Sequence, residues 1–467
     1  MTDLEQCLGA TIEIDETPPD EQVEQEYEQD MWLDREKLIL NESTFAKAFR
    51  DKNGLTYNNG LFYSYEGKVT EEIITKHVWV SLDEMGIGRD VARLTHKLVE
   101  AIKICSTVDK LRVDPNIIPF PEGNFYIKEW AYRIADFTPV PFRLSASLCT
   151  DNIPKTPYFD KWLRDLFYKE DIPTIQEYLG YCLVPTTRAQ KALFLLGEGG
   201  AGKSGLGVIL QAILGDAIIN IANTQEFLQD KFKLPELEHK LVLYDDDLDS
   251  QALSETGLYK KLITNTLAIT ADRKYGQPFK FTPQIKLVAC CNKMLSSMYD
   301  NTSGFYRRLL PVIVKPISRD FVPDKDFYEH LKQEADGIVP WIMQGLCRLI
   351  ENNWVLSESK RTKDYMQLKQ SIDNPLPQFM ETVFDFDPTS PGIPTTEIMQ
   401  VYEVWCRKNN YTPQKSRSVQ LWLADNGERY NISASQNITI SDGKRVRGYK
   451  GLTIRKEWKS DGRIMLN

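Results

Sequence analysis

The stretch that decides the fold is LFLLGEGGAGKS, residues 193–204. Its four apolar residues predict a buried strand, its glycines predict a turn, and the Lys-Ser pair would begin a helix. Such a loop can cradle phosphates, because backbone N–H groups and the positive end of the helix dipole face the same anion. In this pattern the lysine meets the β- and γ-phosphates and the serine binds Mg²⁺. The residues predicted to form the phosphate site are Gly197, Gly199, Gly200, Ala201, Gly202, Lys203 and Ser204.

Three consecutive aspartates follow the apolar run 241–244 further along the chain. A buried strand that ends in acid provides one carboxylate for the metal and a second to orient or deprotonate the attacking water. We expect Asp245 to hold the metal and Asp246 to act on the water, an assignment that a shift of one position would change. A solvated acidic loop is the alternative, but it does not explain the apolar run.

Two further polar sites lie next to apolar runs. Asn292 ends the apolar run 285–291 and could hydrogen-bond the γ-phosphate or the water, although an Asn at a strand end is often only a turn residue. Arg307 and Arg308 precede another apolar run and could reach the γ-phosphate of a neighbouring subunit as an arginine finger. The alternative for the arginines is an ordinary surface pair.

Residues 269–281 have the pattern of a hairpin. They lie between the apolar run 241–244 that precedes the aspartates and the apolar run 285–291 that precedes Asn292. The tip of the hairpin carries Arg273, Lys274 and Tyr275. Two cations and an aromatic ring can neutralise phosphates and stack a base of single-stranded DNA. Solvated turn residues are the alternative.

The apolar runs 192–196, 241–244, 285–291 and 309–314 alternate with helical patterns. This alternation predicts an α/β core with a parallel sheet covered on both faces. A nucleotide would then bind beyond the carboxyl ends of the strands.

Charge is distributed unevenly along the chain. Residues 1–34 contain twelve Asp or Glu and no Lys or Arg, so removing them from a net charge of −9 leaves +3 for the remainder. We expect this acidic tail to be disordered. Residues 37–150 combine hairpin signals after Asn59-Gly60 with an amphipathic helix over 91–105, and we interpret them as an accessory domain.

The last ninety residues change character. Two helical patterns, 396–408 and 416–425, precede a hairpin with arms at 438–440 and 446–454. Residues 391–467 hold thirteen Lys or Arg against seven Asp or Glu, which favours DNA over a protein partner. Two helices and a basic hairpin are typical of a winged helix, whose second helix enters the major groove. The hairpin cations are Lys444, Arg445, Arg447 and Lys450.

The order of these motifs resembles the superfamily III helicases of the AAA+ class. The nearest match is the phage and plasmid primase-helicase family, including replication initiator helicases of staphylococcal-type mobile genetic islands. The resemblance covers residues 37–316 and includes the segment QEYLGYCLVP, residues 176–185. It implies a hexameric ring that hydrolyses ATP with Mg²⁺ between subunits while channel hairpins pull on DNA. Lys203, Ser204, Asp245, Asp246, Asn292 and Arg308 would form the ATP site, with Lys274 as the channel lysine.

Two departures from the family pattern stand out. Gly205 replaces the hydroxyl residue that often follows the Lys-Ser pair, and no primase domain precedes the helicase motifs. Any primase would then act as a separate chain. The family pattern does not settle which of Arg307 and Arg308 is the finger, and we slightly prefer Arg308.

The sequence therefore predicts four regions. These are an acidic tail over 1–36, an accessory domain of mixed α+β structure over 37–150, an AAA+ P-loop ATPase over 151–370 and a winged-helix DNA-binding domain over 371–467. We expect a cytoplasmic ATP-dependent DNA helicase and replication initiator that forms a homo-oligomer and has no membrane segment. The alternatives are a DNA-binding regulator whose ATPase is an assembly switch, and a DNA-packaging or remodelling ATPase.

Overall fold

The computed structural model describes residues 8–14, 33–34, 39–64, 67–109, 111, 113–134, 140–248, 257–264, 268–272, 278–294, 303–316, 324–409, 411–440, 442–460 and 463–464. The chain divides into two compact units, Met1–Thr362 and Lys363–Asn467. Each unit is described by itself. None of the helices within the described ranges has the length and apolar content needed to cross a membrane.

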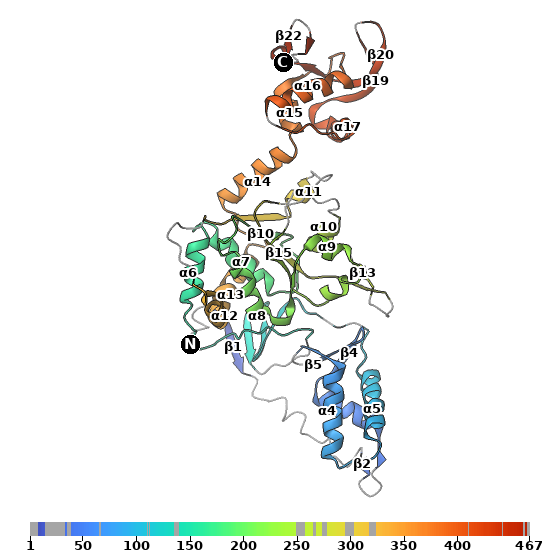
Figure 1. Ribbon diagram of the computed structural model, residues 1–467, viewed down its shortest axis with the longest axis vertical. Helices are drawn as coiled ribbons and strands as arrows, with labels where there is room; N and C mark the ends of the chain where they lie inside the picture. The colour runs from blue at the N-terminus through green and yellow to red at the C-terminus, as the bar shows by residue number, and fades with distance from the viewer. Residues whose placement is uncertain are drawn as a thin grey trace. The chain divides into compact units, whose positions relative to one another are not determined.

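A five-stranded parallel sheet forms the centre of the first unit (Figure 1). Its order is β11 (Ile218–Ile221), β12 (Val242–Asp245), β15 (Lys286–Cys291), β10 (Ala192–Leu196) and β16 (Leu309–Ile313). Every residue of β10, β12 and β15 is buried, so both faces of the sheet are covered. This confirms the four predicted strands and the parallel α/β core. The sequence missed β11, an edge strand in which an exposed Asn interrupts the apolar run.

Helices surround this sheet. They are α6 (Pro157–Leu166), α7 (Ile172–Cys182), α8 (Gly205–Leu214), α9 (Thr224–Gln229), α10 (Gly257–Thr264), α11 (Ser303–Tyr306), α12 (Phe327–Gln333) and α13 (Ala335–Glu351). Helices α7 and α13 approach so closely that a Cβ added to Gly180 would lie 2.6 Å from the Leu346 nitrogen. A Cβ at Gly345 would lie 2.3 Å from the Gln176 oxygen. Glycine is therefore required on both helices.

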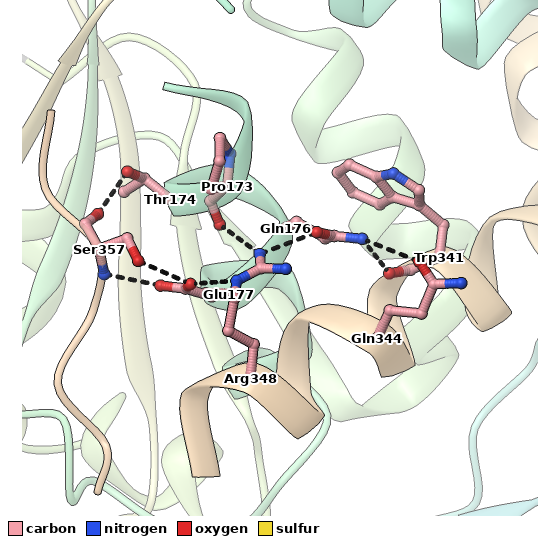
Figure 2. Close-up of polar contacts among 8 residues, drawn as sticks. All are labelled: Pro173, Thr174, Gln176, Glu177, Trp341, Gln344, Arg348 and Ser357. Carbon is pink, nitrogen blue, oxygen red and sulfur yellow. Dashed lines mark hydrogen bonds and ion pairs between the residues drawn. The ribbon is translucent and has the colours of Figure 1, made fainter. Parts of the chain in front are cut away.

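A buried polar network fixes α7 against α13 (Figure 2). The Glu177 side chain is fully buried, and its Oε1 accepts from Arg348 Nε at 2.6 Å. Ser357 donates to the same carboxylate through its backbone N–H at 2.7 Å and its hydroxyl at 2.8 Å. Arg348 also donates to Gln176 Oε1, and Gln176 Nε2 donates to the Trp341 carbonyl. The buried charge thus has an ionic partner and several hydrogen bonds, as a buried carboxylate requires.

A second sheet packs on the same core. Its order is β1 (Thr11–Ile14), β9 (Ala131–Ile134), β8 (Gly123–Tyr126) and β7 (Ile117–Phe120). Ile118, Phe120, Phe125 and Tyr132 share one hydrophobic cluster with β10. The predicted accessory region therefore contributes its last strands to the core of the α/β sheet.

Strand β1 lies inside the stretch for which the sequence predicts a disordered tail. It pairs in parallel with β9, and Glu13 forms an ion pair with Arg133 at 2.7 Å. The alternating Thr-Ile-Glu-Ile pattern suits an edge strand with one covered face. Order at residues 11–14 is thus a correction to that expectation, and it arises from pairing with a strand more than a hundred residues away.

The remainder of the accessory region has a hydrophobic cluster of its own. This part consists of α3 (Glu42–Lys52), β4 (Thr56–Asn58), β5 (Leu61–Ser64), β6 (Gly67–Val69), α4 (Glu71–Glu84) and α5 (Val91–Ser106). It also includes β3 (Ile39–Leu40), which pairs with β2 (Leu33–Asp34), a second short strand inside the predicted tail. The predicted helix over 91–105 is confirmed as α5. The predicted hairpin is confirmed as β4 and β5, joined at Asn59 (φ 49°) and Gly60 (φ 82°).

The second unit begins at Lys363, inside α14 (Lys360–Asp373), so only the first residues of this helix belong to the first unit. Its elements are α15 (Leu376–Val383), β17 (Phe384–Phe386), β18 (Ile393–Pro394), α16 (Thr395–Lys408), α17 (Ser416–Asp425), α18 (Gly427–Tyr430), β19 (Ser433–Thr439), β20 (Arg445–Lys450), β21 (Leu452–Ile454), β22 (Lys459–Ser460) and β23 (Arg463–Ile464). Both predicted helices are confirmed as α16 and α17. Strand β20 lies between β18 and β19 in an antiparallel sheet.

The predicted second arm of the C-terminal hairpin, 446–454, is two strands. The chain turns at Gly451, where φ is +87° and a Cβ would lie 2.4 Å from the Asn431 oxygen. Beyond the turn, β21 leaves β20 and pairs with β17. The single predicted arm is therefore wrong, because a left-handed glycine redirects the backbone to a strand that precedes both helices.

Candidate nucleotide-binding site

The glycine-rich loop connects the carboxyl end of β10 to the start of α8. Gly200 and Gly202 have φ of 80° and 91°, a region that residues with a Cβ rarely adopt. A Cβ added to Gly199 or Gly202 would meet nothing within 4 Å. The loop thus curls beside open space at the amino end of a helix, as phosphate binding requires.

The other glycines of this segment are required by packing. A Cβ at Gly197 would lie 2.4 Å from Val314 Cγ2, and one at Gly205 would lie 2.5 Å from Trp162 Nε1. Trp162 Nε1 also donates to the Gly202 carbonyl at 3.0 Å. The departure at Gly205 therefore has a structural cause, since a side chain there would displace the tryptophan that supports the loop.

Lys203 is 8% exposed and lies within the curve of the loop. Its Nζ donates to the carbonyls of Gly197 at 2.6 Å and Glu198 at 2.8 Å. The side chain thus places one positive charge at the concave side of the loop.

Two of the three aspartates point in different directions. Asp246 Oδ2 accepts from Ser204 Oγ at 2.8 Å. Asp245 is fully buried, and its Oδ2 accepts from the Thr224 N–H at 2.8 Å and hydroxyl at 2.6 Å. Asp245 is the last residue of β12 and Asp246 follows it; of these two carboxylates, the one that contacts the residue before α8 is Asp246. The carboxylate beside Ser204 is that of Asp246, where the sequence placed Asp245.

Asn292 lies at the carboxyl ends of the strands, as the loop does. It directly follows β15, the strand between β12 and β10, and it is exposed. The Gly197 N–H donates to the Cys291 carbonyl at 3.2 Å, which holds the end of β15 against the start of the loop. The structure thus brings Asn292, the loop and the aspartates to one end of the strands.

Arg307 and Arg308 lie at the opposite end of the strands, where the strands begin. The Ala192 N–H, at the start of β10, donates to the Arg308 carbonyl at 2.8 Å, whereas the loop follows the other end of β10. Five residues at about 3.3 Å each place the two ends roughly 17 Å apart. Arg307 is exposed, while Arg308 is half-buried and donates through NH1 to the Gly304 carbonyl.

The predicted internal hairpin is confirmed. Strands β13 (Ile269–Ala271) and β14 (Phe279–Phe281) pair in antiparallel fashion. The Phe279 and Phe281 rings stack with centroids 5.5 Å apart. The predicted contact residues Arg273, Lys274 and Tyr275 lie outside the described residues.

In the second unit the four predicted cations are all exposed. Lys444 lies in the turn between β19 and β20, and Arg445, Arg447 and Lys450 lie on β20. Arg447 Nε donates to Gln436 Oε1 at 2.8 Å across the strands. Strand β20 is tied to α17, because the Tyr449 hydroxyl donates to the Gln420 carbonyl at 3.1 Å. The hairpin cations and α17 thus belong to one connected structure.

The family DUF5906, described as a family of unknown function, matches residues 195–308. That range contains the glycine-rich loop, the aspartates, the internal hairpin, Asn292 and both arginines. The chain is also 23% identical over 376 residues to L207/L206 of Acanthamoeba polyphaga mimivirus, a protein named as a candidate helicase. The match covers 71% of this chain but 38% of the viral protein. The chain is thus similar to a helicase-like viral protein.

The fold has a counterpart among solved structures. The apo structure of the C-terminal region of NrS-1 matches 85% of this chain and 95% of that chain, with a TM-score of 0.50 and 12% sequence identity. At this identity the match describes the fold alone.

Proposed function

We propose that this chain is an ATP-dependent DNA helicase that initiates replication of a phage or mobile element. The contact between Ser204 and Asp246 beside the glycine-rich loop carries the proposal. The similarity to a helicase-like viral protein supports it. The order β11-β12-β15-β10-β16 also supports an AAA+ core, because it places the Asn strand between the loop strand and the acidic strand.

The residues of the site fit ATP and Mg²⁺. The loop has room for phosphate at Gly199 and Gly202, and Lys203 supplies a cation at its concave side. Mg²⁺ prefers oxygen ligands and commonly takes one or two from the protein and the rest from phosphate and water. Ser204 and Asp246 supply such oxygens, so we assign to Asp246 the metal role that was predicted for Asp245. Asn292 then orients the attacking water.

The arginine position supports a ring. Arg307 and Arg308 lie at the ends of the strands away from their own loop, so any nucleotide site that they serve would be that of another copy. An arginine finger from a neighbouring subunit stabilises the charge of the transition state, so one subunit by itself has an incomplete site. The exposed Arg307 suits this role better than Arg308, whose guanidinium contacts the Gly304 carbonyl. We infer a homo-oligomer, with a hexamer as the expected size.

DNA would be held in two places. The hairpin of β13 and β14 would carry Lys274 into a central channel. The second unit would act as a winged helix that binds the replication origin, with α17 in the major groove and the hairpin cations on phosphates. The order β18, α16, α17, β19, β20 and the central position of β20 support this part of the proposal.

Hydrolysis and strand separation by the full chain test the function. We expect ATP hydrolysis to rise with single-stranded DNA and a forked duplex to be separated, and Lys203→Ala to lose both while keeping its circular dichroism spectrum. Hydrolysis without strand separation would favour the assembly-switch or packaging alternative. Unwinding by Lys203→Ala would reject the site itself.

A further inference from the structure

A hydrogen-bond chain leads from the core of the sheet to the proposed metal ligand. Tyr244, on β12, is 5% exposed, and its hydroxyl lies 2.6 Å from Asp246 Oδ1. The same hydroxyl lies 3.4 Å from the sulfur of Cys290 on β15. The second oxygen of Asp246 accepts from Ser204. Both carboxylate oxygens are therefore held, one by the P-loop helix and one by Tyr244.

The number of protons on each group determines which group donates in each of these hydrogen bonds. The Tyr244 hydroxyl has one proton, which it donates to Asp246 Oδ1. An ionised carboxylate can only accept. Because the Tyr244 proton is donated to Asp246, the Cys290 S–H is the donor to the tyrosine oxygen.

The ring of Tyr244 is fixed by a specific match between α8 and β12. A Cβ at Gly207 would lie 2.4 Å from Tyr244 Cε1. Ser204 directly precedes α8 and is three residues before Gly207, and Asp246 directly follows β12, two residues after Tyr244. The absent side chain at Gly207 makes room for the ring at the depth that lets its hydroxyl reach Asp246.

We propose that Tyr244 is a positioning residue that orients the Asp246 carboxylate toward the metal beside Ser204. This inference rests on the proposed nucleotide site. The neutral Tyr244 donor holds Oδ1, so Oδ2 faces Ser204, where the metal would bind both oxygens, and the plane of the carboxylate is fixed before Mg²⁺ arrives. Partners of metal-binding carboxylates act in this way and typically change metal affinity or activity by about 10- to 100-fold.

Tyr244→Phe tests the role, because it keeps the ring against Gly207 and removes only the hydroxyl. We expect the Mg²⁺ concentration for half-maximal ATP hydrolysis to rise by about 10-fold. Mn²⁺ binding in the presence of ADP, followed by electron paramagnetic resonance, should weaken by a similar factor. ATP affinity measured without metal should stay the same.

Tyr178→Phe is the matched control. The Tyr178 hydroxyl is also buried in the core, but it contacts the carbonyls of Lys191 and Leu287 at 3.0 Å. Its loss should lower the melting temperature and leave the metal dependence unchanged. If Tyr244→Phe does not fold, Cys290→Ala removes the donor behind the tyrosine and should shift the metal dependence in the same direction by less.

Three outcomes separate the claims. A wild-type metal dependence in folded Tyr244→Phe, or in Cys290→Ala where Tyr244→Phe does not fold, means that Tyr244 serves packing alone and overturns the inference. An equal shift in Tyr178→Phe would also overturn it, since stability would explain the effect. Failure of the wild-type chain to bind Mn²⁺ with ADP would reject the proposed site, and this inference with it.

Discussion

Ser204 Oγ donates to Asp246 Oδ2 at 2.8 Å, joining the residue that precedes α8 to the residue that follows β12. This contact selects one of three adjacent aspartates that the sequence alone ranks almost equally. The neighbouring Asp245 is held on the opposite face of the sheet by Thr224. The two carboxylates therefore have different expected roles.

Exchanging each carboxylate for an amide should separate these roles. We expect Asp246→Asn to lower the rate of ATP hydrolysis by about 100-fold or more, because the metal loses a charged ligand. Asp245→Asn should keep most activity, since an amide oxygen can still accept both bonds from Thr224. Steady-state hydrolysis and thermal melting of both variants provide the measurement. The reverse ranking of the two variants would restore the assignment made from sequence.

Mixing variants tests whether the arginines act between subunits. Arg307→Ala alone and Lys203→Ala alone should each lose hydrolysis. A mixture should recover part of the activity, because some interfaces pair an intact loop with an intact Arg307. No recovery after subunit exchange, checked by mass measurement, would argue against an arginine supplied by a neighbour.

The buried network of Figure 2 predicts a large effect on stability. Arg348→Met leaves the buried Glu177 without its ionic partner; breaking a fully buried pair costs about 3–5 kcal/mol, and we expect a smaller loss here because the Arg348 side chain is 37% exposed. Denaturant unfolding of the variant should show that loss. The double variant Glu177→Gln with Arg348→Met should recover part of it, since no charge is then left buried. A double variant no more stable than Arg348→Met would show that packing, not charge, dominates.

Lys286 predicts a pH dependence of stability. Burial lowers the pKa of its ammonium from 10.5 to about 7, although Nζ donates to the Val184 carbonyl. Between about pH 7 and 10.5 the unfolded state thus binds more protons than the folded state, so the free energy of unfolding rises with pH there. Lys286→Met should be more stable near pH 7 and should remove this rise.

The matched control for Lys286 is the exposed Lys76. Lys76→Met should leave the pH profile of unfolding unchanged. The measurement is denaturant unfolding at intervals across the alkaline range. Parallel profiles for wild type and Lys286→Met would contradict the buried-lysine explanation.

The exposed hairpin of the second unit predicts salt-dependent binding to DNA. Replacing Lys444, Arg445 or Arg447 by Ala should weaken binding to DNA of any sequence. The slope of the logarithm of the binding constant against the logarithm of the salt concentration should fall by roughly one for each phosphate that is no longer neutralised. Arg455→Ala is a suitable control, because Arg455 pairs with Asp385 at 2.9 Å away from this hairpin. Fluorescence anisotropy at several salt concentrations measures both. Equal effects of all four variants would indicate general charge rather than a defined interface.

Local pattern predicted much of this structure. Runs of apolar residues located four strands of the central sheet, and periodicity located α5, α16 and α17. Turn residues located the hairpins of β4 with β5 and of β13 with β14. Each of these depends on residues close together in the chain. Strands β1 and β11 were missed because they lie at sheet edges. There a segment forms a strand because it pairs with a strand that is distant in sequence, which local pattern does not reveal.

The sequence by itself determined the chemistry available at residues 197–204 and the set of acids, amide and arginines that could serve it. Only the tertiary structure decided which carboxylate faces Ser204, because the pleat of β12 and the position of α8 place Asp246 there and turn Asp245 toward Thr224. It also decided that the arginines lie at the ends of the strands away from their own loop. Both outcomes depend on the order and direction of strands that are distant in sequence, which local pattern does not encode.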